Sequence, residues 1–168
     1  MALLNATTYG DVVDAVAGYL PTVMSSRPDV FTDLSGNPVV WPVNNYMADQ
    51  GPNKTYPCVT LTEAGEIETN LPGDTENLHT LYPINVLIEG REAITADPTK
   101  DYWLAVRKCL MDAFRQRLLS IGTPFTGQPT CQTDVKPRAV FNKGDEQYQF
   151  VRSHFLLLVW VNEQRVQP

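Results

Sequence analysis

A run of seven apolar residues at positions 155–161 constrains the fold of this chain more than any other feature. A helix that crosses a bilayer needs about 20 such residues, so the run is too short to span a membrane. In a strand, successive side chains point to opposite faces, so both faces of this segment are apolar. Such a strand lies at the centre of its sheet, or one of its faces meets another subunit. We therefore predict a long final strand over residues 147–162.

The side chains of this strand are also candidates for a contact between subunits. Its apolar faces need cover that a small domain supplies only in part, and tryptophan is common at the centre of protein interfaces. The interface candidates are Phe155, Leu157, Val159, Trp160 and Val161.

Two segments have the spacing of amphipathic helices. Residues 7–24 place valine, tyrosine and leucine side chains at helical intervals, behind a threonine that can cap the N-terminus. Residues 97–121 predict a longer helix, in which Asp97 caps the N-terminus and Pro98 occupies the first helical position. Gly122 follows where a left-handed C-terminal cap is needed.

Alternating apolar and polar residues predict strands at 56–62 and 80–89, and a C-terminal β-hairpin over residues 130–162. Pro137 interrupts the first strand of that hairpin, which favours a place at a sheet edge or a bulge. Residues 25–55 are rich in Pro, Asn, Ser and Gly, and predict a loop-rich insertion around one short strand.

The order of these elements predicts one α+β domain over residues 1–168, with a mixed, mainly antiparallel sheet of four to five strands. Both helices pack on one face of the sheet, and the other face stays open unless something covers it. A chain of this length buries roughly 70% of the surface that its unfolded form exposes, so it folds without disulfides or bound metal ions. The three cysteines, Cys58, Cys109 and Cys131, fit no metal-binding spacing and are expected to be reduced.

An acidic segment at residues 63–79 contains five carboxylates and no Lys or Arg. These residues are Glu63, Glu66, Glu68, Asp74 and Glu76. Paired carboxylates can perform acid–base chemistry or bind Ca²⁺ or Mg²⁺, but the spacing here is not that of a calcium-binding loop. We interpret the segment as an acidic loop or a projecting hairpin, whose negative surface faces a partner or a channel.

The overall charge argues against a nucleic-acid-binding surface. The net charge is −6 and the isoelectric point is about 4.8, so the surface repels phosphates. Lys136 and Arg138 form a local exception that is too small to hold a duplex. We count both among the candidates for a subunit interface.

Neither histidine indicates a catalytic site. His154 follows Ser153 within a strand, so the two side chains point to opposite faces and cannot form a nucleophile–base pair. His79 has no second His or Cys nearby in sequence that would complete a metal site. The glycines match no phosphate-binding motif. The sequence therefore predicts that the chain is not an enzyme and has no catalytic residue, metal ligand or cofactor.

The order of the elements and the residue pattern of the strands resemble those of a known family. An N-terminal helix precedes Tyr-Pro-Cys-Val-Thr-Leu and Tyr-Pro-Ile-Asn-Val-Leu-Ile-Glu. A long helix with Asp-Tyr-Trp-Leu-Ala-Val-Arg-Lys-Cys-Leu-Met-Asp-Ala-Phe comes next, and a hairpin with an apolar last strand closes the chain. Over residues 8–162, this pattern resembles the tail-terminator, or tail-completion, family of long-tailed bacteriophages.

The resemblance implies a homo-oligomer, a hexameric ring that caps the tail tube and stops its polymerisation. The ring would contact the tail tube protein on one side and the head–tail connector, or stopper, on the other. DNA would pass through its centre without specific binding, along an acidic lining that repels it. The resemblance also implies a place in the tail or neck of the virion, after assembly in the host bacterial cytoplasm. The N-terminus lacks the pattern of a signal peptide, and we expect no membrane association.

Three other functions remain open as alternatives. The chain could be another neck or head-completion protein of the same particle, placed between the portal and the terminator. A small metal-dependent hydrolase would use the acidic segment at 63–79 as its site. A peptide-binding adaptor would use the strand edge at Pro137 to pair with an extended peptide.

Overall fold

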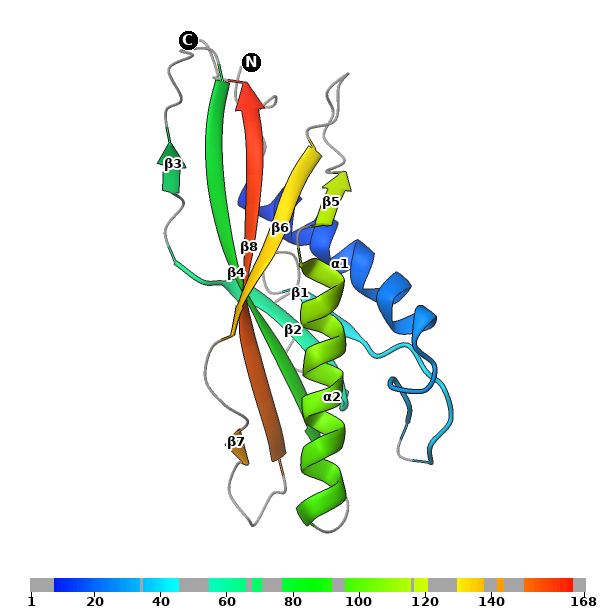
Figure 1. The fold of residues 1–168 in the computed structure, drawn as a ribbon. Helices are drawn as coiled ribbons and strands as arrows, with labels where there is room; N and C mark the ends of the chain where they lie inside the picture. The colour runs from blue at the N-terminus through cyan, green and yellow to red at the C-terminus, as the bar shows by residue number, and fades with distance from the viewer. Residues whose placement is uncertain are drawn as a thin grey trace.

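The computed structural model of the chain describes residues 8–33, 35–45, 55–65, 68–70, 77–91, 96–115, 117–120, 130–137, 142–143 and 150–164. Two helices pack against one face of a twisted sheet, which confirms the predicted α+β class (Figure 1). The helices are α1 (Tyr9–Ser26) and α2 (Ala96–Phe114). The strands are β1 (Val43–Asn45), β2 (Cys58–Glu63), β3 (Glu68–Asn70), β4 (Asn77–Arg91), β5 (Arg117–Ser120), β6 (Thr130–Pro137), β7 (Asn142–Lys143) and β8 (Phe150–Gln164).

The sheet has the strand order β1-β2-β4-β8-β6-β5, with β3 paired to β4 and β7 paired to β8. Only β1 and β2 run parallel among the described strands, and every other pair is antiparallel. The central strands β4 and β8 pair along their whole length, from Asn77 opposite Gln164 to Arg91 opposite Phe150. The prediction that the 155–161 run belongs to a central strand is therefore confirmed.

Helix α1 begins where the sequence predicts it, and Thr8 is its capping residue. The Asp11 backbone N–H donates to Thr8 Oγ1 at 3.1 Å, and the Thr8 N–H donates to Asp11 Oδ2 at 2.9 Å. This reciprocal pair satisfies two N–H groups that the first turn leaves without helical partners. The helix continues through Pro21 to Ser26, because Val23 and Met24 still pack into the core.

The predicted end of the second helix is wrong. We predicted a helix to residue 121, whereas α2 ends at Phe114 and residues 117–120 form strand β5. The hydroxyl of Thr133 donates to the Phe114 carbonyl at 2.8 Å, which satisfies a carbonyl at the end of the helix. The backbone of β5 then pairs with the edge of β6, from Arg117 opposite Thr133 to Ser120 opposite Thr130.

The acidic segment is not a loop throughout. β3 pairs antiparallel with β4, with Glu68 opposite Leu81 and Asn70 opposite His79. The projecting hairpin is therefore the alternative that the structure supports, and β4 begins within the predicted loop. Glu66, Asp74 and Glu76 lie outside the described residues.

The loop-rich segment after α1 is anchored to the helices by aromatic side chains. Trp41 packs against Phe31 and Trp103, at ring-centroid distances of 5.1 Å and 5.5 Å. Trp41 Nε1 donates to the carbonyl of Thr32 at 3.0 Å, and Tyr102 Oη of α2 donates to the carbonyl of Val30 at 2.7 Å. The sequence predicts the short strand of this segment at 38–43, whereas β1 covers Val43–Asn45 and pairs with β2.

The core lies between the two helices and the face of the sheet that they cover. α1 lies against β1 and β4, and α2 lies against β8 and β6. The largest fully buried side chains are Trp41, Phe31, Phe114, Phe155, Leu20, Met24, Leu61, Ile84, Ile88, Leu110 and Leu157. Neither α1 nor α2 combines the length and apolar character that a bilayer-spanning helix needs, and no other helix occurs in the described ranges.

Candidate functional site

The face of the sheet that points away from the helices is the candidate site. Residues directly opposite each other in an antiparallel pair share a face. Tyr82 opposite Val159 and Ile84 opposite Leu157 point into the core. The residues between them therefore point the other way. We define the open face as Leu81, Pro83, Leu87, Leu156, Leu158 and Trp160, which all lie on β4 and β8.

The apolar side chains of the open face are only partly covered. Leu158 and Trp160 are half-exposed, as are Pro83 and Leu87, while Leu156 is 7% exposed. Among the described residues, no helix lies on this side of the sheet (Figure 1). Partly exposed apolar side chains that share one face of a sheet, here Pro83, Leu87, Leu158 and Trp160, are candidates for a contact with another molecule.

Charged and polar side chains border the open face. Exposed Asp134 and Lys136 of β6 stand opposite Leu158 and Leu156, so they share this face. His154 and Asn85 of the central strands lie within it. Lys136 thus has the position that an interface residue needs, while Arg138 lies outside the described residues.

Four of the five apolar interface candidates are core residues instead. Phe155, Leu157, Val159 and Val161 are 0% exposed and pack under the helices of the same chain. A neighbouring subunit cannot reach them unless the helices move away. Only Trp160 belongs to the open face.

Sequence reasoning missed Leu156 and Leu158. Their own strand is apolar on both faces, so it holds no signal that separates the two sets. The neighbouring strand does hold one, because Pro83 and Asn85 alternate with Tyr82 and Ile84. Transferring that alternation to β8 requires the register of the pair, which the structure supplies.

On the side of β2, the open face is bounded by a buried polar group. Glu89 is 1% exposed and accepts a hydrogen bond from Thr60 Oγ1 at 3.2 Å. Thr60 Oγ1 lies 3.5 Å from Asn44 Nδ2, which donates to it from β1. This chain of hydrogen bonds satisfies polar atoms whose burial is otherwise costly, so we assign it a structural role.

The catalytic and metal candidates do not converge in the described residues. Ser153 is buried on the core face, and His154 is half-exposed on the open face, as their adjacent positions in a strand predict. Glu63 is exposed at the end of β2. Within the described ranges, no three His, Cys, Asp or Glu side chains lie close enough to hold a metal ion. Cys58 and Cys109 are in the thiol form, and burial raises the pKa of the Cys109 thiol.

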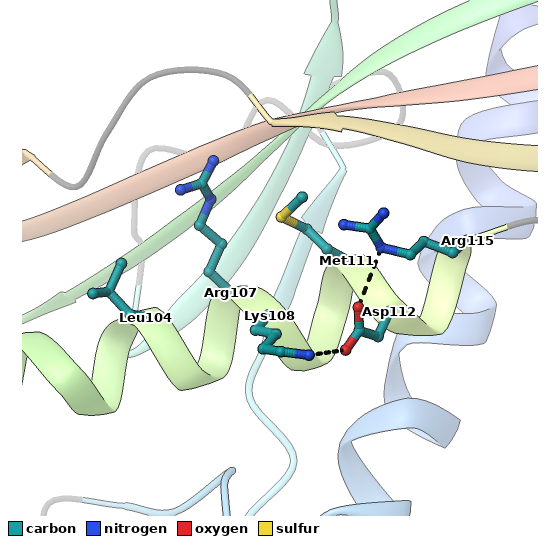
Figure 2. A pocket seen from close by; sticks show the side chains of 6 residues that line it. All are labelled: Leu104, Arg107, Lys108, Met111, Asp112 and Arg115. Atoms are coloured by element: carbon teal, nitrogen blue, oxygen red, sulfur yellow. Dashed lines mark hydrogen bonds and ion pairs between the residues drawn. The ribbon is translucent and has the colours of Figure 1, made fainter.

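The outer surface of α2 carries a shallow hollow of about 220 Å³. Its lining residues are Leu104, Arg107, Lys108, Met111, Asp112 and Arg115. Figure 2 shows Asp112 between Lys108 and Arg115, at 2.7 Å from Lys108 Nζ and 3.2 Å from Arg115 Nε. The hydrogen bond from Lys108 holds the pKa of the Asp112 carboxyl below its usual value. The hollow is smaller than the roughly 300 Å³ at which small-molecule sites begin, so we interpret it as a cationic surface.

No protein-family model matches the sequence, and the comparison with curated proteins finds no match.

Proposed function

We propose that the chain is a structural subunit of a phage tail terminator, which forms a ring that caps the tail tube and joins it to the head-side connector. The open face is the observation that carries this proposal. It lies on the two longest and most central strands, where Pro83, Leu87, Leu158 and Trp160 are partly exposed while Leu81 and Leu156 are buried. Subunits of assemblies bury such surfaces against their neighbours.

The chemistry of the open face supports a protein partner. Trp160 stands beside Leu81 at one end, and Leu158 stands beside Pro83 in the middle. Asp134 and Lys136 add a charged border on β6. An apolar centre with a polar rim is the usual composition of a protein–protein interface. We assign the open face to the component on which the ring stacks.

The resemblance in element order supports the terminator role in particular. The charge of the chain fits a channel through which DNA passes without specific contact, since a net charge of −6 repels phosphates. The opposite directions of Ser153 and His154 support a structural role over a catalytic one. A head-completion protein of the same particle is the nearest alternative, and it differs in which component it binds.

Replacement of Leu158 with aspartate tests this assignment. We expect the wild-type protein to co-sediment with tubes polymerised from the tail-tube subunit of the same particle. In Leu158→Asp, a carboxylate replaces an apolar contact, and its desolvation weakens binding by about 2 kcal/mol or more, roughly thirtyfold. The measurement is the fraction of protein in the pellet as a function of tube concentration.

Val40→Asp is the matched control, because Val40 is 43% exposed in the loop before β1 and lies outside the open face. This variant should co-sediment like the wild type. If the wild type stays in the supernatant, or Leu158→Asp binds as well as Val40→Asp, the assignment is wrong. Binding to the portal instead of to tubes would favour the head-completion role.

A further inference from the structure

The charges of the chain are divided unequally along its length. Residues 1–90 contain two Lys or Arg and eleven Asp or Glu, a net charge of −9. Residues 91–168 contain eleven Lys or Arg and eight Asp or Glu, a net charge of +3. The net charge of −6 therefore conceals two halves of opposite sign.

Within the sheet, the strands of these two halves lie on separate sides. In the strand order β1-β2-β4-β8-β6-β5, the first three strands come from the acidic half and the last three from the basic half. α1 lies against β1 and β4, whereas α2 lies against β8 and β6 (Figure 1). The halves meet along the β4–β8 pair, so the difference in charge along the sequence becomes a difference across the sheet.

One side of the molecule has an acidic surface, which we call the acidic flank and define by Asp14 and Glu63. Asp14 is exposed on α1, and its Oδ1 accepts a hydrogen bond from Asn45 Nδ2 of edge strand β1 at 2.7 Å. Glu63 is exposed at the end of β2. This end of β2 lies near the start of α1, because the backbone N–H of Ala64, the next residue, donates to Tyr9 Oη at 3.4 Å. Neither α1 nor β2 contains a Lys or Arg.

A second surface is cationic, which we call the basic flank and define by Lys108 and Arg115. Figure 2 shows these side chains on α2 around Asp112. The side chains of Lys108 and Arg115 are 77% and 53% exposed. Asp112 pairs with both cations and offsets one of the two positive charges, so the surface stays cationic. Leu104 adds an exposed apolar side chain to it.

We propose that copies of this chain associate head to tail, with the basic flank of one copy against the acidic flank of the next. The proposal rests on the proposed function, whose ring requires a contact between neighbouring copies. Two acidic flanks repel each other, as do two basic flanks, so a two-fold symmetric contact through either flank is disfavoured. A contact between two different surfaces repeats from copy to copy, and it closes a ring when the rotation allows. The exposed charges of the two flanks chiefly set the orientation and the rate of such an association.

Charge reversal on each flank tests this contact in the full chain. Asp14→Lys/Glu63→Lys makes both flanks positive, and Lys108→Glu/Arg115→Glu makes both flanks negative. Each variant alone should associate roughly a hundredfold more weakly than the wild type, because like charges then face each other. An equimolar mixture should recover the wild-type mass, because every contact in an alternating ring is again between opposite charges. A single chain with all four substitutions should recover it as well.

The measurement is the mass of the assembly by sedimentation equilibrium, with circular dichroism to verify that each variant is folded. Association of the wild type should weaken in 1 M salt, where the screening length falls to about 3 Å. Val39→Lys and Val39→Glu are the controls, since they add a positive or a negative charge at an exposed position outside both flanks and outside the open face.

Failure of the flank contact and failure of the proposed function give different results. A wild-type ring that persists in high salt, and in both reversed variants, overturns the flank contact and leaves the terminator role standing. The flank contact is also overturned if neither the equimolar mixture nor the chain with all four substitutions recovers the wild-type mass. A wild-type monomer at high concentration that stays off tail tubes overturns both proposals.

Discussion

Replacement of Gly90 with alanine is expected to lower the free energy of unfolding by about 3 kcal/mol, at the upper end of the range for overpacked cores. Gly90 lies near the end of β4, and a Cβ atom there would stand 2.1 Å from Cη2 and 2.3 Å from Cζ2 of the Trp103 indole. Trp103 is 4% exposed, so the ring has little room to shift. Either the strand or α2 must move to admit the methyl group.

Urea denaturation monitored by circular dichroism measures this loss. Gly18→Ala is the matched control, because a Cβ at Gly18 meets nothing within 4 Å and alanine favours the interior of a helix by up to about 1 kcal/mol. Trp103→Leu should make the Gly90→Ala change less costly, since it removes the atoms that clash. A Gly90→Ala protein as stable as the wild type would show that the indole does not pack on this strand.

Two adjacent leucines should respond very differently to truncation. Leu157→Ala is expected to lower the free energy of unfolding by 2–5 kcal/mol, because it leaves a cavity under the helices. Leu157 is 0% exposed, whereas its neighbour Leu158 is half-exposed on the open face. We expect Leu158→Ala to lower the free energy of unfolding by less than about 1 kcal/mol, because little packing is lost at Leu158.

The comparison is sharp because the chemical change is the same at both positions. Denaturant midpoints of the two variants, measured against the wild type, give the difference directly. Equal losses would mean that the two faces of β8 are equally covered within one chain, and the open face would then have no basis.

Much of the fold could be predicted from local patterns. The doubly apolar run at 155–161 predicted a strand that lies at the centre of its sheet or meets another subunit, and β8 lies between β4 and β6. The threonine before the first helix indicated a cap, and Thr8 forms it with Asp11. These features depend on residues that are close in sequence, so the local sequence pattern is sufficient to predict them.

The remaining errors come from contacts between distant residues. Leu118 fits the spacing of the long helix, but the Thr133 hydroxyl bonds to the carbonyl of Phe114 at the helix end, and β6 offers an edge to pair with. The sequence also could not distinguish Leu157 from Leu158, because only the register with β4 assigns each to a face. The separation of charge between the flanks likewise depends on the strand order.

An image of tail tubes assembled with the purified protein tests the central claim most directly. Electron cryomicroscopy of the tube ends should show a ring of six copies of the 18.8 kDa chain on one end of each tube. The sheet face that contains Leu158 and Trp160 should point toward the tube, and the flanks should meet between neighbouring copies. Bare tube ends, with the protein absent or bound only at the portal, would contradict the account.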